Sequence, residues 1–249
     1  MPRNKPYLTY PEDSLQNMIQ PDPWWVVDEG CKIERGRLVK AFIPHVDQNP
    51  YTLIAKGRKE PTQHTEAIVE IHPLNIRQIV RYPQLPVAAL PQHEKEVFTV
   101  YRAKKRPAII ISYGGLDVDK KLTLGKPKWQ SAPTVLEAPF YGGDESEKRS
   151  GFTPAFIERI RRCEHPQFFW DNLPIDNSVK DSILRWDHIQ PVGRTLDSLE
   201  PTQYRLSEAA MMFVDEWLAW IITGQLEENS MLWDYREGLM QIPGHHCNG

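Results

Sequence analysis

Residues 104–112 read Lys-Lys-Arg-Pro-Ala-Ile-Ile-Ile-Ser, three basic residues and a proline followed by an unbroken apolar run. Isoleucine favours the pleated backbone of a strand, and consecutive apolar residues are typical of a strand that is buried on both faces. The run Ala108–Ile111 therefore predicts a central strand. Because a buried strand is rigid, the basic cluster at its start is expected to hold its charges in fixed positions.

Short apolar runs on both sides of this segment predict further strands. The runs are bounded by glycine, proline or polar turn residues, and they cover Leu38–Ile43, Ala67–Ile71, Val97–Tyr101, Thr134–Ala138 and Ser182–Trp186. The chain holds 22 prolines against 14 glycines, and prolines at this frequency interrupt long helices. We therefore expect a mainly β fold with helices, in the α+β class.

Two helices are predicted in the second half of the chain. Thr153, which a proline follows, is a good N-cap for a short helix that ends near Cys163. Residues 206–223 carry the clearest helical pattern, which Ser207 can begin and Gly224 can end. The apolar residues of this second helix extend beyond one face. It is therefore expected either to be sandwiched within the monomer or to form a subunit contact.

The composition is that of an ordinary globular chain of 249 residues, with 40% hydrophobic and 25% charged residues. Thirty basic against 33 acidic residues give a formal net charge of -3, which excludes a uniformly basic nucleic-acid coat but allows a local basic cleft. No apolar run reaches membrane-spanning length, and residues 1–10 lack the apolar core of a signal peptide, so a cytoplasmic protein with no membrane partner is expected. The three cysteines lie far apart, which favours reduced thiols over disulfides.

The sequence holds no glycine-rich phosphate loop, no nucleophile elbow and no paired Cys-x-x-Cys motif. His245-His246-Cys247 offers metal-binding atoms, but no second cluster at ligand spacing accompanies it, so no metal site is expected. The basic cluster before the central strand is the stronger candidate, because arginine offers forked donors that match a phosphate. A solvated rim with no binding role is the alternative for this cluster.

Histidines and arginines elsewhere give weaker signals. His45 follows the first strand and has Asp47 two residues on, a spacing that allows an acid–base pair. His188 follows a strand directly, where a structural role is expected. The short helix carries three arginines that are expected on its exposed face, Arg159, Arg161 and Arg162.

The order of these segments resembles the MazF/PemK toxin family. The most specific match is Lys105–Ser112, which is close to the family's Arg-Pro-Ala-Val-Val-Val-Ser strand. Arg35–Val39 is similar to the family's opening Arg-Gly-Asp-hydrophobic strand, with Arg37 in place of the aspartate. Three later blocks resemble the next strand, the Asp-Gln-Ile segment and the terminal helix; they are Thr134–Pro139, Ser182–Val192 and Leu206–Thr223.

This resemblance implies an SH3-like β-barrel, usually a homodimer, that cleaves single-stranded RNA without a metal or another cofactor. In such enzymes the 2′-hydroxyl attacks the neighbouring phosphate, an arginine donates a proton and stabilises charge, and a threonine contacts the phosphate. Arg106 matches that arginine. Tyr141 falls at the position of the threonine and keeps a hydroxyl, which it carries farther from the backbone. An antitoxin protein is an implied partner.

The site that follows from the resemblance has two parts. Catalysis is assigned to Arg106, Tyr141 and, as a candidate general base, His45. RNA contact is assigned to Arg102, Lys104, Lys105 and Ser112. The alternative is a catalytically inactive barrel module that binds nucleic acid or a protein partner, with Arg106 buried in a salt bridge rather than facing an open groove.

The expected domain organisation is an N-terminal arm, a barrel domain with two insertions, and a tail. These parts cover residues 1–34, 35–224 with insertions at about 44–104 and 142–180, and 225–249. The charged segment Gly142–Gly151 follows Tyr141 directly. It is expected to be either a lid over the site or a plain connection.

Overall fold

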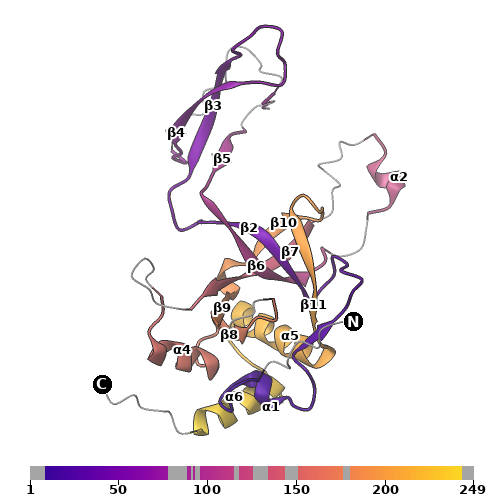
Figure 1. Cartoon of the computed structure of the whole chain (residues 1–249), viewed down its shortest axis with the longest axis vertical. Helices are drawn as coiled ribbons and strands as arrows, with labels where there is room; N and C mark the ends of the chain where they lie inside the picture. Colours follow the sequence, from indigo (N-terminus) through magenta and orange to yellow (C-terminus); the bar gives the residue numbers. More distant parts are fainter. Residues whose placement is uncertain are drawn as a thin grey trace. The chain divides into compact units, whose positions relative to one another are not determined.

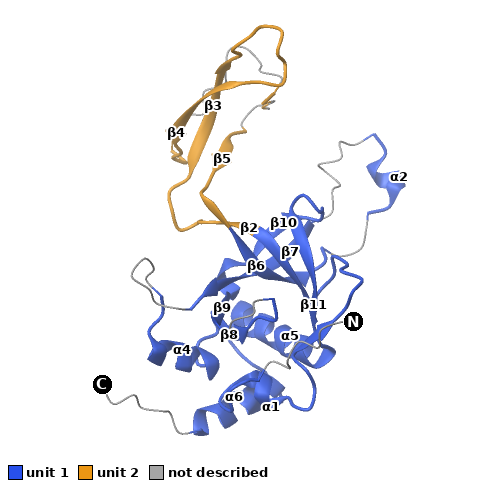
Figure 2. Ribbon diagram, in the orientation of Figure 1, with its two compact units in different colours: residues 1–41, 105–249 blue, residues 42–104 orange. Residues whose placement is uncertain are grey.

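The computed structural model describes residues 9–77, 89–90, 92, 96–114, 118–125, 134–143, 151–175 and 180–242. The chain divides into two compact units (Figure 2). Unit 1 consists of Met1–Ala41 and Lys105–Gly249, and unit 2 is Phe42–Lys104. Unit 2 is thus close to the first stretch that the resemblance marks as an insertion.

Unit 1 is built on a curved antiparallel sheet of eight strands (Figure 1). The strand order is β1-β11-β2-β6-β7-β9-β8, and β10 pairs with β7. The strands are β1 (Trp25–Val27), β2 (Arg37–Pro44), β6 (Ala103–Ser112), β7 (Thr134–Gly142), β8 (Phe168–Asn172), β9 (Asp181–Arg185), β10 (Gln190–Gly193) and β11 (Leu199–Leu206). With the helices described below, this sheet confirms the predicted fold class, mainly β with helices.

The isoleucine run lies in the middle of this sheet, as predicted. β6 pairs with β7 in a register that sets Ala108 opposite Pro139 and Ile110 opposite Glu137. Residues 108–111 are all buried, which matches an apolar run with no polar face. Alternate side chains of the run belong to different faces of the sheet, and Ile109 belongs to the large core that the helices cover.

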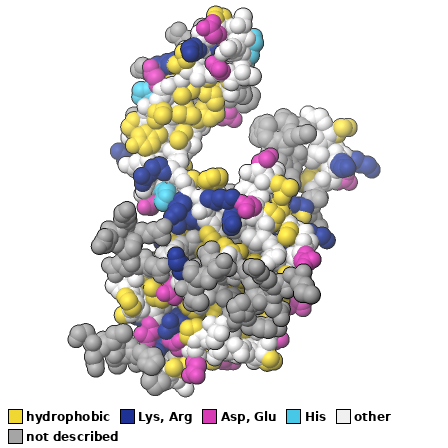
Figure 3. Space-filling model, in the orientation of Figure 1, with side chains coloured by type: hydrophobic (Ala, Val, Ile, Leu, Met, Phe, Trp, Pro, Cys, Tyr) yellow, Lys and Arg dark blue, Asp and Glu magenta, His cyan; other side chains and the backbone are white. Residues whose placement is uncertain are grey.

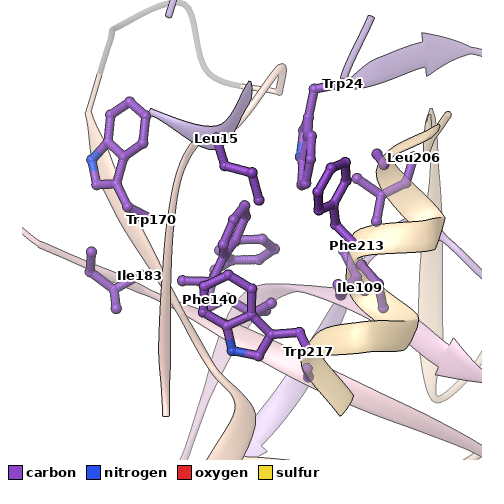
Figure 4. Packing of buried hydrophobic residues seen from close by; sticks show 14 of the residues in the cluster. Leu15, Trp24, Ile109, Phe140, Trp170, Ile183, Leu206, Phe213 and Trp217 are labelled. Atoms are coloured by element: carbon purple, nitrogen blue, oxygen red, sulfur yellow. The ribbon is translucent and has the colours of Figure 1, made fainter. Parts of the chain in front are cut away.

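Helix α5 (Glu208–Thr223) covers that core. The hydroxyl of Ser207 accepts a hydrogen bond from the backbone of Ala210, and Gly224 ends the helix with a positive φ of 75°, a conformation that glycine adopts without strain. Trp217 and Phe213 of α5 point into the core with Trp24 and Phe140 (Figure 4). Both helix ends predicted from the sequence are thus confirmed.

Segments expected as arm and tail contribute to this core. Part of the expected arm forms the short helix α1 (Leu15–Met18), whose Leu15 is buried. Part of the expected tail forms α6 (Met231–Gln241), whose Leu232 and Leu239 are fully buried. α6 packs on α5 and covers part of its wide apolar surface within a single chain, while Met212 and Ile222 of α5 stay 53% and 80% exposed.

The arginines of α4 (Pro154–Arg161) correct an expectation. Arg161 Nη2 lies 2.7 Å from Asp13 Oδ2, and Arg162 Nη2 lies 2.8 Å from Glu158 Oε1. The side chains of Arg161 and Arg162 are only 20% and 12% exposed, so the exposed-face prediction was wrong for both and holds for Arg159 alone. Arg162, the C-cap of the helix, also lies near Asp13, with its Nε 3.6 Å from Asp13 Oδ2, so two arginines bind the N-terminal segment.

The remaining elements of unit 1 are short. They are α2 (Lys120–Thr123) and the 3₁₀ turn η1 (Trp186–His188), which directly follows β9. Among the helices of the described ranges, none is long and apolar enough to cross a membrane.

Unit 2 is a three-stranded antiparallel sheet with the order β4-β3-β5. Its strands are β3 (Tyr51–Gly57), β4 (Ile68–Pro73) and β5 (Phe98–Val100). The registers Tyr51↔Pro73, Leu53↔Ile71 and Leu53↔Phe98 place apolar residues on one face, because side chains alternate along a strand. Ile71 is 63% exposed, and Figure 3 shows hydrophobic side chains gathered on this unit.

Arg37 is fully buried at the start of β2, and all its donors are used. Its Nε donates to the carbonyl of Lys32, and Nη1 donates to the carbonyls of Asp28 and Thr202. Nη2 donates to the carboxylates of Asp28 and Glu34. Arginine has five N–H donors, so this set satisfies every one of them. The hydrogen bond from Arg37 is the largest of the effects that hold the pKa of Asp28 below its ordinary value.

We expect Arg37→Lys to destabilise unit 1. A lysine ammonium offers three donors from one nitrogen and cannot replace the planar fork. The free energy of unfolding should fall by about 3 kcal/mol, near the lower limit for a broken buried ion pair, because both carboxylates contact solvent. Urea unfolding measures the loss. The matched control is Arg159→Lys, which alters an exposed pair with Glu164 and should change stability by less than about 1 kcal/mol. Equal losses in both variants would contradict this role of Arg37.

Candidate functional site

Arg106 and Tyr141 lie together at one end of the β6–β7 pair. Continuing the register that sets Ala108 opposite Pro139 places Arg106 opposite Tyr141. The guanidinium carbon of Arg106 lies 4.3 Å from the centroid of the Tyr141 ring, a cation–π contact. Both side chains are partly buried. The structure therefore brings together the two residues to which the sequence assigned phosphate contact.

His188 joins this pair from η1. Its Nδ1 lies 2.7 Å from the Tyr141 hydroxyl, and its Nε2 lies 2.9 Å from Nη2 of Arg185. β9 pairs with β7 through Tyr141↔Ile183, and η1 follows β9 directly, which explains the position of the histidine. The sequence predicted a structural role for His188. Both ring nitrogens have hydrogen-bond partners, which is compatible with that role, and one of these partners is a predicted site residue.

The partners of His188 decide where its proton lies. An arginine only donates, so Nε2 of His188 must accept from Arg185. The remaining ring proton of the neutral imidazole then lies on Nδ1, which donates to the oxygen of Tyr141. We assign this tautomer from the hydrogen-bond partners. It follows that the phenol oxygen accepts a hydrogen bond from His188.

Arg185 is held rigidly beside this site. Its Nε and Nη2 donate to the two oxygens of Asp187 at 2.7 and 2.6 Å. Partial burial acts to raise the pKa of Asp187, but the hydrogen bonds and charge of Arg185 outweigh it and lower that pKa. The guanidinium carbon of Arg185 lies 5.9 Å from the ring centroid of Tyr141 and 5.0 Å from that of Phe168. Two guanidinium groups thus lie beside the phenol.

The other residues assigned to the site lie apart from this pair or belong to unit 2. Lys105 makes an ion pair with Glu200, so its charge is already partnered. Ser112 lies at the other end of β6, about 20 Å along the strand from Arg106, and its hydroxyl accepts from Gly114 in a turn. The structure does not bring Ser112 to the Arg106–Tyr141 pair, and its assignment to RNA contact stays a prediction.

His45, Arg102 and Lys104 belong to unit 2. The backbone N–H of His45 donates to the carbonyl of Arg102 at 2.8 Å, and Arg102 Nε donates to the side chain of Gln48. Among the side-chain contacts of the described residues, none joins His45 to Asp47. The acid–base pair suggested by their spacing is therefore not formed.

Glu137 is a buried carboxyl on the same face of β7 as Tyr141, because four residues separate them. One oxygen accepts from Gln190 Nε2 at 2.8 Å, and the other has no hydrogen-bond partner among the described residues. Burial raises the pKa of Glu137 to about 7, although the bond from Gln190 acts to lower it. A glutamate inside the apolar run of residues 135–138 is a sequence signal that could have identified this group.

The described residues contain no group of three or more His, Cys, Asp or Glu side chains that could hold a metal ion. The sequence His245-His246-Cys247 and most of the expected lid, residues 144–150, lie outside the described residues. Comparison with known proteins adds no assignment, because no protein-family model and no curated protein matches the chain. The geometry of the site is therefore the basis for a functional assignment.

We expect Glu137→Gln to flatten the pH dependence of stability. Because burial raises the pKa of Glu137 from 4.5 to about 7, its contribution is fully present below 4.5 and is lost as the pH rises through 7. Over that interval the wild type should lose a few kcal/mol of unfolding free energy, at about 1.4 kcal/mol for each pKa unit. Glutamine stays neutral and should remove this loss. Urea unfolding between about pH 5 and pH 8 measures the slope.

Glu200→Gln is the control for that measurement. Lys105 lowers the pKa of Glu200, so this exposed carboxyl contributes stability only above its ordinary pKa and loses it at more acidic pH. Its replacement should leave the slope in the neutral range unchanged. Wild-type and Glu137→Gln chains with the same slope would show that the carboxyl does not titrate as argued.

Proposed function

We propose that the protein is a metal-independent endoribonuclease of the toxin type, which cleaves single-stranded RNA by attack of a 2′-hydroxyl on the neighbouring phosphate. The observation that carries this proposal is the convergence of Arg106 and Tyr141, two groups that can both donate to a phosphate. Their arrangement agrees with the Arg-Pro strand that resembles the MazF/PemK family. His188 is hydrogen-bonded to the phenol, and Arg185 is hydrogen-bonded to His188.

Each group has a role in the proposed reaction. The 2′-oxygen forms a bond to phosphorus while the bond to the 5′-oxygen breaks, which leaves a 2′,3′-cyclic phosphate and a 5′-hydroxyl. Arg106 binds the phosphate oxygens and stabilises the charge that develops on them. Tyr141 donates toward the leaving 5′-oxygen, because its hydroxyl already accepts from His188. The proton of the 2′-hydroxyl passes to water; His45, which the sequence analysis named as its base, belongs to unit 2.

The alternative is a catalytically inactive module that binds RNA or a protein partner. Two observations favour it. Tyrosine occupies the position where the resemblance expects threonine, and Lys105 forms an ion pair with Glu200. A homodimer and an antitoxin partner belong to the toxin proposal, and both are tested by measuring the mass of the protein in solution with and without candidate partners.

Arg106→Ala should abolish most of the cleavage without unfolding the chain. Removal of one positioned charge donor lowers a rate by about 10²- to 10³-fold. The assay is incubation with a long single-stranded RNA in the presence of a chelator, followed by end-group analysis for 2′,3′-cyclic phosphate and 5′-hydroxyl ends. Arg159→Ala is the matched control, because it removes an exposed arginine that pairs with Glu164 outside the site, and it should change the rate by no more than a few-fold.

Two outcomes contradict parts of this proposal. A folded Arg106→Ala chain that cleaves at the wild-type rate excludes this site. A wild-type chain that binds RNA but produces no new ends supports the inactive module.

Tyr141→Phe and His188→Asn should impair the same step. Phenylalanine keeps the ring that Arg106 covers and removes only the hydroxyl, so the loss should appear in kcat and not in KM. We expect a loss of about 100-fold for Tyr141→Phe and a smaller loss for His188→Asn, since His188 acts through the phenol. The double variant should be no slower than Tyr141→Phe alone, because residues that act as a unit are not additive. Additive losses would mean that the two residues act separately.

A further inference from the structure

Unit 2 contains a pocket of about 310 Å³ where β3 begins and β5 ends. The pocket is lined by Gln48, Asn49, Tyr51, Val100, Tyr101 and Arg102. Sites for drug-sized ligands occupy about 300–1,000 Å³, so this pocket suits a single small group. Neither the sequence analysis nor the proposed reaction assigns a role to most of these residues.

Two tyrosines supply the aromatic surface of the pocket. Tyr51 is 49% exposed, and the pairing of Tyr51 with Val100 fixes its place on the apolar face of the sheet. Tyr101 follows that strand directly and is partly buried. Neither hydroxyl makes a hydrogen bond with another described residue. Partly exposed tyrosine rings held on a sheet are suited to stacking on unpaired bases.

Arg102 supplies an oriented pair of donors. Its Nε donates to Gln48 Oε1 at 3.0 Å, and its carbonyl accepts from the backbone of His45 at 2.8 Å. The turn that carries Gln48 is itself closed by a bond from its backbone N–H to the carbonyl of His45. Nη1 and Nη2 make no hydrogen bond within the described part of the chain. The guanidinium is therefore fixed at Nε and exposed at its other two nitrogens.

We propose that this pocket binds one unstacked guanine base of a single-stranded RNA, which stacks on the tyrosines and is read by Arg102. Guanine presents two adjacent acceptors, O6 and N7, which match the two donors of an arginine fork, whereas neither adenine nor uracil presents two adjacent acceptors. RNA as the ligand rests on the proposed function. The pocket itself stands on its own residues, and its binding is measured without cleavage.

The test is binding of short oligouridylates with and without one central guanosine, followed by fluorescence anisotropy. The full chain carries Arg106→Ala so that the RNA stays intact. The guanosine should raise affinity about tenfold or more. Tyr51→Ala and Tyr101→Ala should each lower affinity for the guanosine oligomer by about 5- to 100-fold, and Tyr51→Phe should restore it. Arg102→Lys keeps the charge and loses the fork, so it should abolish the preference for guanosine.

Ile71→Ala is the control within the same sheet. Ile71 lies on the same face as Tyr51 but outside the pocket, and its replacement should leave affinity unchanged. A loss equal to that of Tyr51→Ala would assign binding to the whole apolar face and overturn the proposal. Equal affinity for both oligomers, or unchanged affinity in folded tyrosine variants, would also overturn it. A wild-type chain that binds guanosine through this pocket but does not cleave RNA overturns only the proposed function.

Discussion

The sheet of unit 1 depends on one buried side chain, Arg37, whose five N–H donors all have hydrogen-bond partners. Arg37 belongs to β2, yet its five donors bind the loop of residues 28–34 and the carbonyl of Thr202 in β11. It therefore joins β2 to β11 at the point where the register between these strands shifts, between Pro201 and Arg205. A β-bulge leaves backbone groups without ladder partners, and a side chain with several donors can supply them.

The candidate site depends on the pairing registers of β6 with β7 and of β7 with β9. Arg106 meets Tyr141 because β6 and β7 pair with Ala108 opposite Pro139. His188 reaches the phenol because β9 pairs with β7 and ends at η1. A slip of one residue in either pairing would turn one of these side chains to the other face of the sheet. The isoleucine run is buried on both faces, so it places β6 in the middle of the sheet but does not by itself choose the register.

Local features were predictable from the sequence, whereas long-range partners were not. The isoleucine strand, the N-cap Ser207 and the Gly224 terminus follow from local chemistry. α6 was expected as a tail, although Ser230 is an N-cap that the sequence displays. The buried leucines of that helix depend on α5, whose Glu216 accepts bonds from the start of α6. The contact of His188 with Tyr141 could not be predicted, because no local sequence pattern encodes the pairing of β7 with β9.

The way in which unit 2 is attached to unit 1 affects how the sequence of this chain can evolve. The chain leaves unit 1 at the end of β2 and returns at the start of β6, and these two strands are neighbours in the sheet. In topological terms the whole of unit 2 is therefore the loop of a β-hairpin. The entropic cost of closing such a loop grows only slowly with the length of the loop. Insertion, replacement or shortening of this unit can thus proceed without rebuilding the sheet that holds Arg106 and Tyr141.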